Sequence, residues 1–336
     1  MPQPEAGDVL VVAPRPEIRG RLGTAATTAT TRARTSATVP EDLARGPAGV
    51  VVVDYDGLAP SERARLRHQM LARRDLPSLV LCSDGDYGLA ELCQRAGLNH
   101  IVANNGRPGF SEIAATVAAL VEGSPLGLES HFADGTLEGI AHLTDSSLRD
   151  AVIAAAEGFA IELGTAGRLV NAFVTVTDEL MTNALYNAPV DVDGRHRHAT
   201  SSRQDRVELG SDEAITVRWV GDADCLGVSV SDPFGSLRVE QVRSFLAAHL
   251  RADERTPHRG PGGARLGLRL AFAAASRIIC NIAPGQRTEI IAFVDTDTSY
   301  RIQSRRAKSF HIHAGREACG RRWAAQRSTT GVDPIP

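Results

Sequence analysis

Glu179 and Asn183 have the clearest capacity for chemistry, because they stand four residues apart in the segment Thr177-Asp-Glu-Leu-Met-Thr-Asn-Ala-Leu-Tyr-Asn-Ala-Pro189. On a helix this spacing places both side chains on one face, one turn apart. The carboxylate can orient or deprotonate a nucleophile, and the amide oxygen can bind Mg²⁺. The alternative is an amphipathic helix that carries two solvated polar residues.

The element that must position these side chains is a long helix packed on a core. Apolar residues recur at helical spacing along one face of this segment. They are Val170, Phe173, Val174, Val176, Leu180, Met181, Ala184 and Leu185. Two later segments carry a strand-end acid and a glycine-rich loop. They are Ser231-Asp-Pro-Phe-Gly235 and Gly262-Gly-Ala-Arg-Leu-Gly-Leu268, of which the second opens another apolar helix.

Taken in order, the three segments resemble the N, G1 and G2 boxes of the GHKL superfamily, which comprises gyrase-type ATPases, histidine kinases and anti-sigma-factor serine kinases. The resemblance implies ATP and Mg²⁺ as ligands, with Glu179 as general base and Asn183 as the metal ligand. Asp232 would accept a hydrogen bond from the adenine amino group. The other nucleotide-binding residues that it implies are Asn187, Gly235, Gly263, Arg265, Leu266, Gly267 and Thr288.

Two departures from the family pattern affect the phosphate end of this site. Arg265 stands where a third glycine is expected, so its side chain either crowds the phosphates or binds them. Tyr186 stands where relatives often have Lys. Gly263 and Gly267 still allow backbone amides at a helix N-terminus to approach phosphate. Nucleotide binding is therefore a firmer expectation than turnover.

The first third of the chain alternates short apolar runs with helical stretches, which predicts a parallel sheet covered on both faces. The expected strands are Asp8–Val12, Gly49–Asp54, Ser78–Ser83 and His100–Ala103. This segment resembles a response-regulator receiver domain, in which Asp54 takes the position of the phosphoacceptor. The acidic pair that holds Mg²⁺ in that family is replaced by Ala13-Pro14. The resemblance thus implies a degenerate receiver that docks a partner, and phosphorylation of Asp54 stays open.

These readings give an α/β fold with two domains. A receiver-like doubly wound parallel sheet is expected over residues 6–122, a linker over 123–144, and a GHKL-type α/β sandwich, a mixed sheet covered by helices, over 145–300. A terminal strand and a basic tail are expected over 301–336. The helix Val239–Leu250 and the charged stretch after it lie where the superfamily keeps its ATP lid, and we expect them to be weakly packed.

Composition favours a cytoplasmic protein. The formal net charge of -3 does not favour nucleic-acid binding, and no apolar run is long enough to span a membrane. The five cysteines are scattered and never in Cys-x-x-Cys spacing, which indicates reduced thiols. The polar stretch from Asp191 to Glu213 predicts a mobile loop. His196 with His198, and His311 with His313, are too isolated to predict a metal site.

Two functions follow as alternatives. The first is a bacterial-type signal-transduction regulator that acts as an anti-sigma-type serine/threonine protein kinase on a protein partner. No His followed by an acid occurs between Ser146 and Pro189, which argues against autophosphorylation on His. The second is a non-catalytic nucleotide-binding module that works by protein–protein interaction through its receiver-like domain. A homodimer stays open, and a small-molecule enzyme is disfavoured because the first strand lacks a glycine-rich turn.

Overall fold

The structure is a computed structural model that describes residues 8–30, 32–74, 76–105, 109–133, 136–198, 201–203, 205–251 and 263–315, with only the backbone for 263–267. The chain is an α/β protein that divides into two compact units. The first contains the chain up to Leu126, and the chain returns to it at helix α7 (Val239–Leu250) and at residues 307–312. The rest of the described chain forms the second unit.

The first unit is built on a parallel sheet with the strand order β2-β1-β3-β4-β5. This order occurs in doubly wound α/β folds. Its strands are β1 (Val9–Val12), β2 (Ala33–Ser36), β3 (Val50–Asp54), β4 (Ser78–Cys82) and β5 (His100–Ala103). Strands β1, β3, β4 and β5 are buried along their whole length, as their runs of apolar residues predict. The predicted parallel arrangement is confirmed.

Helices α1 (Pro16–Ala29) and α4 (Phe110–Glu122) pack together on a shared core. That core contains Val9, Val52, Leu81 and Ile113, among others. A second group of helices consists of α2 (Pro60–Ala72), α3 (Tyr87–Glu91), the π-helical turn η1 (Leu92–Ala96) and α7. The packing of α7 in this unit contradicts the prediction of a weakly packed segment.

Strand β11 (Ser309–Ala314) pairs antiparallel with β5 through Phe310 and His311. His311 is buried, and its Nε2 lies 2.9 Å from Oε1 of Glu112 on α4. The terminal strand that the sequence predicts is therefore present, and it lengthens the sheet of the first unit. Residues 316–336, which carry much of the predicted basic tail, lie outside the described residues.

The second unit contains an antiparallel sheet with the order β9-β10-β8-β7-β6. Its strands are β6 (Leu137–Leu143), β7 (Ile215–Gly221), β8 (Cys225–Asp232), β9 (Arg277–Ala283) and β10 (Arg287–Asp295). The two predicted hairpins, β7–β8 and β9–β10, are confirmed. Strand β6 was not foreseen, since it lies within the range predicted as a linker.

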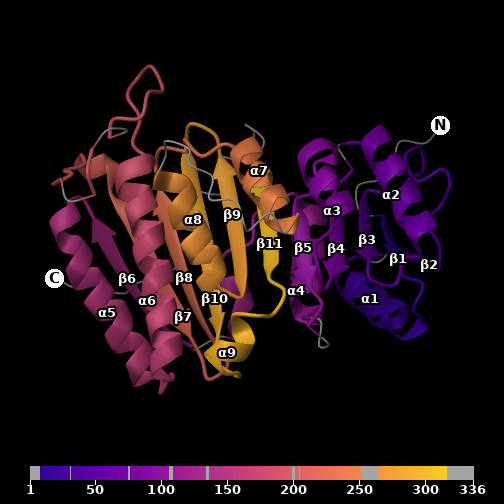
Figure 1. Cartoon of the computed structure of the whole chain (residues 1–336), viewed down its shortest axis with the longest axis horizontal. Helices are drawn as coiled ribbons and strands as arrows, with labels where there is room; N and C mark the ends of the chain where they lie inside the picture. Colours follow the sequence, from indigo (N-terminus) through magenta and orange to yellow (C-terminus); the bar gives the residue numbers. More distant parts are fainter. Residues whose placement is uncertain are drawn as a thin grey trace. The chain divides into compact units, whose positions relative to one another are not determined.

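Three helices pack side by side over this sheet: α5 (Arg149–Glu162), α6 (Gly167–Thr182) and α8 (Gly263–Ala274) (Figure 1). The side of the sheet that they cover is marked by Trp219 on β7, whose ring meets that of Phe159 on α5. By strand register, Val228 and Asp232 on β8 share the face of Trp219. Asp232 therefore projects to the helix-covered face.

Candidate functional site

Helix α6 carries Glu179 and passes directly into the π-helical turn η4 (Asn183–Asn187), which carries Asn183 and Asn187. The apolar face predicted for this helix is confirmed, and Phe173, Val176 and Leu185 are among its fully buried members. Widened turns of this kind occur often at functional sites, because the extra residue redirects the side chains that follow. The first predicted segment thus forms one wall of the candidate site, and this wall carries three polar residues near its C-terminal end.

Glu179 is largely buried, and its Oε2 lies 3.4 Å from Nη1 of Arg203. Oδ1 of Asn183 accepts a hydrogen bond of 3.0 Å from Nδ2 of Asn187. An amide oxygen has two lone pairs, so this bond leaves one for a further contact. Both residues therefore present oxygen atoms, and the carboxylate already has a cation against it.

Asp232 ends β8, where it is buried and accepts hydrogen bonds from the backbone N–H groups of Phe234 (2.9 Å) and Gly235 (3.2 Å). Burial raises the pKa of Asp232 to about 6, against the opposing effect of these hydrogen bonds. Within the described part of the chain, Asp232 forms no ion pair. Thr288, also buried, stands opposite it on β10. The sequence placed this acid at a strand end, and the structure adds its burial.

Gly235 closes the turn after Asp232 with a positive φ of 57°. A Cβ atom at this position would overlap the carbonyl oxygen of Ala283. The carbonyl of Gly235 accepts a 3.0 Å hydrogen bond from the N–H of Gly285 in the β9–β10 turn. Only glycine fits here, so its place in the Asp-Pro-Phe-Gly segment has a structural cause.

The glycine-rich segment opens α8, whose backbone begins at Gly263. The side chains of Arg265 and Leu266 lie outside the described residues, as does the chain from 252 to 262. Both readings of Arg265 therefore stay predictions, and so does the role of Gly263 and Gly267. The predicted helix Leu266–Ile279 starts three residues earlier and ends at Ala274, after which the chain enters β9.

The elements that carry these residues pack against one another. Helix α6 contacts β8, β10 and α8, and η4 contacts β8 and α8. The loop between η4 and β7 reaches two parts of the same site. Its Arg197 lies over the ring of Phe234, 5.2 Å from the centroid, and its Arg203 contacts Glu179. One loop thus borders both the helical wall and the Asp232 turn.

Parts of this loop, for which the polar composition predicts mobility, pack against the unit. Val207 and Leu209 are buried, and Glu208 forms an antiparallel bridge with Asp145. The hydroxyl of Tyr186 on η4 shares its hydrogen bond between the carbonyl oxygens of Arg203 (3.0 Å) and Asp205 (2.8 Å). The loop is anchored at these points because two apolar side chains and one tyrosine tie it to the unit.

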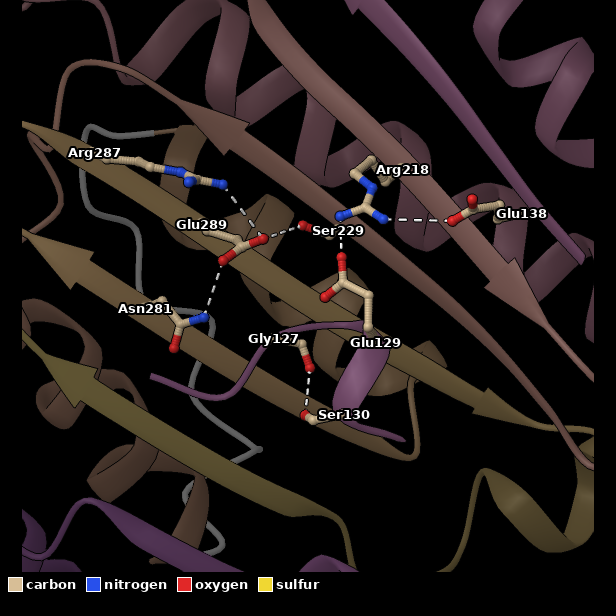
Figure 2. Close-up of polar contacts among 9 residues, drawn as sticks. All are labelled: Gly127, Glu129, Ser130, Glu138, Arg218, Ser229, Asn281, Arg287 and Glu289. Atoms are coloured by element: carbon tan, nitrogen blue, oxygen red, sulfur yellow. Dashed lines mark hydrogen bonds and ion pairs between the residues drawn. The ribbon is translucent and has the colours of Figure 1, made fainter. Parts of the chain in front are cut away.

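A second polar cluster lies on the opposite face of the same sheet (Figure 2). Buried Glu289 on β10 accepts hydrogen bonds from Oγ of Ser229 (2.7 Å) and Nδ2 of Asn281 (3.1 Å), and the guanidinium of Arg287 lies 3.6 Å away. Nearby, Arg218 on β7 pairs with Glu129 and Glu138. Sequence reasoning missed this cluster, because strand register brings its members together from separate strands.

In the first unit, Asp54 ends β3 as predicted and is fully buried. Arg15 pairs with both of its oxygens, with Nε 2.8 Å from Oδ2 and Nη2 on Oδ1. This hydrogen-bonded pair raises the pKa of Arg15. A Cβ atom on Gly57 would stand 2.5 Å from Oδ2, so glycine keeps room for the pair. A guanidinium therefore lies against the carboxylate that the resemblance assigns to phosphorylation.

Models of known protein families give no match to this sequence, and no curated protein matches it significantly. Among the described residues, none of the helices has both the length and the apolar character needed to cross a membrane.

Proposed function

We propose that this chain is an ATP- and Mg²⁺-binding signalling regulator that phosphorylates Ser or Thr on a protein partner, with a GHKL-type second unit and a receiver-like first unit. In this assignment, α6 and η4 form one wall of the nucleotide site. Asp232 binds the adenine, and Gly263 to Gly267 approach the phosphates. The receiver-like unit docks the partner, and the protein acts in the cytoplasm.

The observation that carries the proposal is the environment of Asp232. A carboxylate buried without an ion pair costs stability, and such costs are retained mainly where a site needs the group. Two backbone N–H groups fix the orientation of Asp232. A fixed carboxylate suits an exocyclic amino group, which donates hydrogen bonds and has no charge.

The remaining residues fit a magnesium-bound triphosphate. Mg²⁺ keeps water and phosphate oxygens among its ligands, so it needs few from the protein. Asn183 offers one amide oxygen with a lone pair beyond its bond to Asn187. Bound there, the metal would supply positive charge against the phosphates, and the backbone at the start of α8 would add N–H donors.

In the proposed kinase reaction, the hydroxyl oxygen of a Ser or Thr on the partner attacks the γ-phosphorus of ATP. The bond between that phosphorus and the bridging β–γ oxygen breaks, and ADP leaves. Glu179 orients the attacking hydroxyl and receives its proton, which requires the carboxylate to be released from Arg203. The partner needs no other reactive group, because its hydroxyl supplies both the nucleophilic oxygen and the proton.

Titration calorimetry with ATP, with and without Mg²⁺, tests the site directly. We expect wild-type protein to bind ATP and Asp232→Asn to lose that binding, because an amide presents a different set of acceptors and donors. Labelled ATP with candidate partners tests turnover, and we expect Glu179→Gln to abolish labelling. Equal labelling by both proteins would remove Glu179 from the chemistry, and no ATP binding by the wild type would remove the site.

A second candidate function is a non-catalytic nucleotide-dependent docking module. The two arginine contacts favour it, since Arg15 pairs with Asp54 and Arg203 pairs with Glu179. This function would be supported over the kinase if ATP bound with the same affinity with and without Mg²⁺ and if labelled ATP transferred no label to any partner.

A further inference from the structure

We infer that Arg203 is a phosphate-binding residue of the nucleotide site and that Tyr186 positions it. This inference rests on the proposed function and extends it to Arg203, which lies outside the three segments, and to Tyr186, which lies within the first. The starting observation is the contact between Nη1 of Arg203 and Oε2 of Glu179 at 3.4 Å. It brings a guanidinium to the wall that also carries Asn183.

The position of Arg203 is built into the fold. Ser202 and Asp205 enclose it in a turn closed by two hydrogen bonds, Ser202 N–H to Oδ2 of Asp205 (2.7 Å) and Asp205 N–H to the Ser202 carbonyl (3.0 Å). The hydroxyl of buried Tyr186 holds the same turn through the carbonyls of Arg203 and Asp205. Tyr186 therefore fixes the backbone from which the guanidinium extends.

Charge explains why this arrangement suits a triphosphate. Glu179 and Asp232 are both carboxylates, and an anionic ligand placed beside them needs compensating cations. The Arg203 side chain is 45% exposed, so its guanidinium can turn from Glu179 to an incoming phosphate without unpacking a core. Guanidinium groups bind phosphate oxygens through paired, charge-assisted hydrogen bonds.

The same contact links binding to release of the proposed base. Arg203 pairs with Glu179 in the structure. When a phosphate takes the guanidinium, the carboxylate loses its cation and becomes free to orient a hydroxyl. Only ligands with a phosphate at that end would produce the exchange, so adenosine alone should leave the Arg203–Glu179 pair in place.

Calorimetry with ATP and adenosine on four variants tests this inference. We expect Arg203→Ala to weaken ATP binding about 10-fold or more, as for a lost charged hydrogen bond, and to change adenosine binding less than about twofold. Arg203→Lys should restore part of the affinity. Tyr186→Phe should weaken ATP binding less than Arg203→Ala, and adding it to Arg203→Ala should cause no further loss.

Arg195→Ala is the matched control, because Arg195 lies in the same loop but pairs with Asp193 at 2.8 Å. Its ATP affinity should equal that of the wild type. Wild-type affinity for ATP in Arg203→Ala, or equal losses for ATP and adenosine, would overturn the inference while leaving the proposed function intact. A wild-type protein that binds neither ligand would overturn both.

Discussion

Two buried carboxylates in the second unit show how environment separates their roles. Glu289 receives hydrogen bonds from Ser229 and Asn281 and has Arg287 beside it, so partners compensate its burial. Among the described residues, Asp232 accepts hydrogen bonds from backbone N–H groups and lies beside Thr288, and the more distant charge of Arg287 does not offset its burial, which raises its pKa to about 6. Because strand register places them on opposite faces of one sheet, they can be tested as a matched pair.

We expect the difference in stability between Asp232→Asn and the wild type to change with pH in a defined direction. In the folded wild type the pKa of Asp232 is about 6, above the ordinary value of 3.8. The protonated carboxyl therefore contributes its full stabilisation to the unfolding free energy below pH 4, and this contribution is lost as pH rises through 6. The variant has no carboxyl at this position and lacks this loss. As pH rises from 4 to 7, the unfolding free energy of the wild type should therefore fall by about 2–3 kcal/mol relative to that of the variant.

Urea denaturation across this pH range measures the difference, and Glu289→Gln is the control variant. A pH-independent difference for Asp232→Asn would contradict the assigned cause. Glu289→Gln should leave ATP affinity unchanged, because it lies on the face away from α5 and α6. A variant that is more stable and loses its ligand would display the trade-off typical of functional sites.

For Arg15→Ala we expect a loss of about 3 kcal/mol in unfolding free energy, because it leaves the buried Asp54 carboxylate without its cation. Thermal or urea denaturation measures it, with the exposed Arg34→Ala as control. Combining Arg15→Ala with Asp54→Asn should recover much of the loss. A small effect for the single variant would mean that solvent replaces the guanidinium at Asp54.

For single residues, the sequence alone identified the candidates that a local pattern of a few positions marks. Glu179 and Asn183 were visible as a helical pair, and Asp54 and Asp232 as strand-end acids. Arg15 and Arg203 were not recognised as partners of these acids, because 39 and 24 residues separate each pair. Nothing local marks such an arginine, and only the fold brings it to the carboxylate.

Among the elements, the turn after β8 offers the sharpest steric test. Gly235 has φ +57° and no room for a Cβ, whereas Gly285 has φ +68° and nothing within 4 Å of a Cβ. We expect Gly285→Ala to cost about 1 kcal/mol, from backbone conformation alone. Gly235→Ala should cost at least about 2 kcal/mol more, because the turn must also open. Equal losses in chemical denaturation would show that the turn adjusts freely.

Element type was predictable where the hydrophobic pattern was strong. The buried strands of the first unit and the two hairpins of the second have runs or alternations that few other structures produce. Strand β2, Ala-Arg-Thr-Ser, is a polar edge strand, and β6 begins with exposed residues, so neither shows a buried pattern. Pairing with a neighbour, rather than burial, defines these two strands.

For the molecule as a whole, helix α7 is the least expected feature. It follows the Asp232 turn in sequence, yet Val242, Leu246 and Ala247 are buried and the helix packs on α3 and η1 of the first unit. Nε of Arg243 donates a 2.8 Å hydrogen bond to Oδ1 of Asn99. A division of the sequence into consecutive domains could not assign α7 to the first unit, because the helix is far in sequence from the elements it contacts.

Leu246→Ala should destabilise the first unit by about 2–4 kcal/mol, because it removes a buried leucine from the α7 contact. Hydrogen exchange should quicken in α3 and η1 as well as in α7. Ser244→Ala, at an exposed position of the same helix, should change stability by less than about 0.5 kcal/mol. Faster exchange confined to α7 would show that the helix adds little to the unit.

The return of the chain to the first unit at α7 and β11 also constrains how the gene could be rearranged. Many multidomain proteins arise when a contiguous coding block is exchanged for another. Here a block ending at Leu126 would omit two pieces that the first unit uses, and any replacement would have to fit the α7 and β11 left behind. Recombination at a single junction would therefore yield incomplete units, so we expect the two halves to have been inherited together.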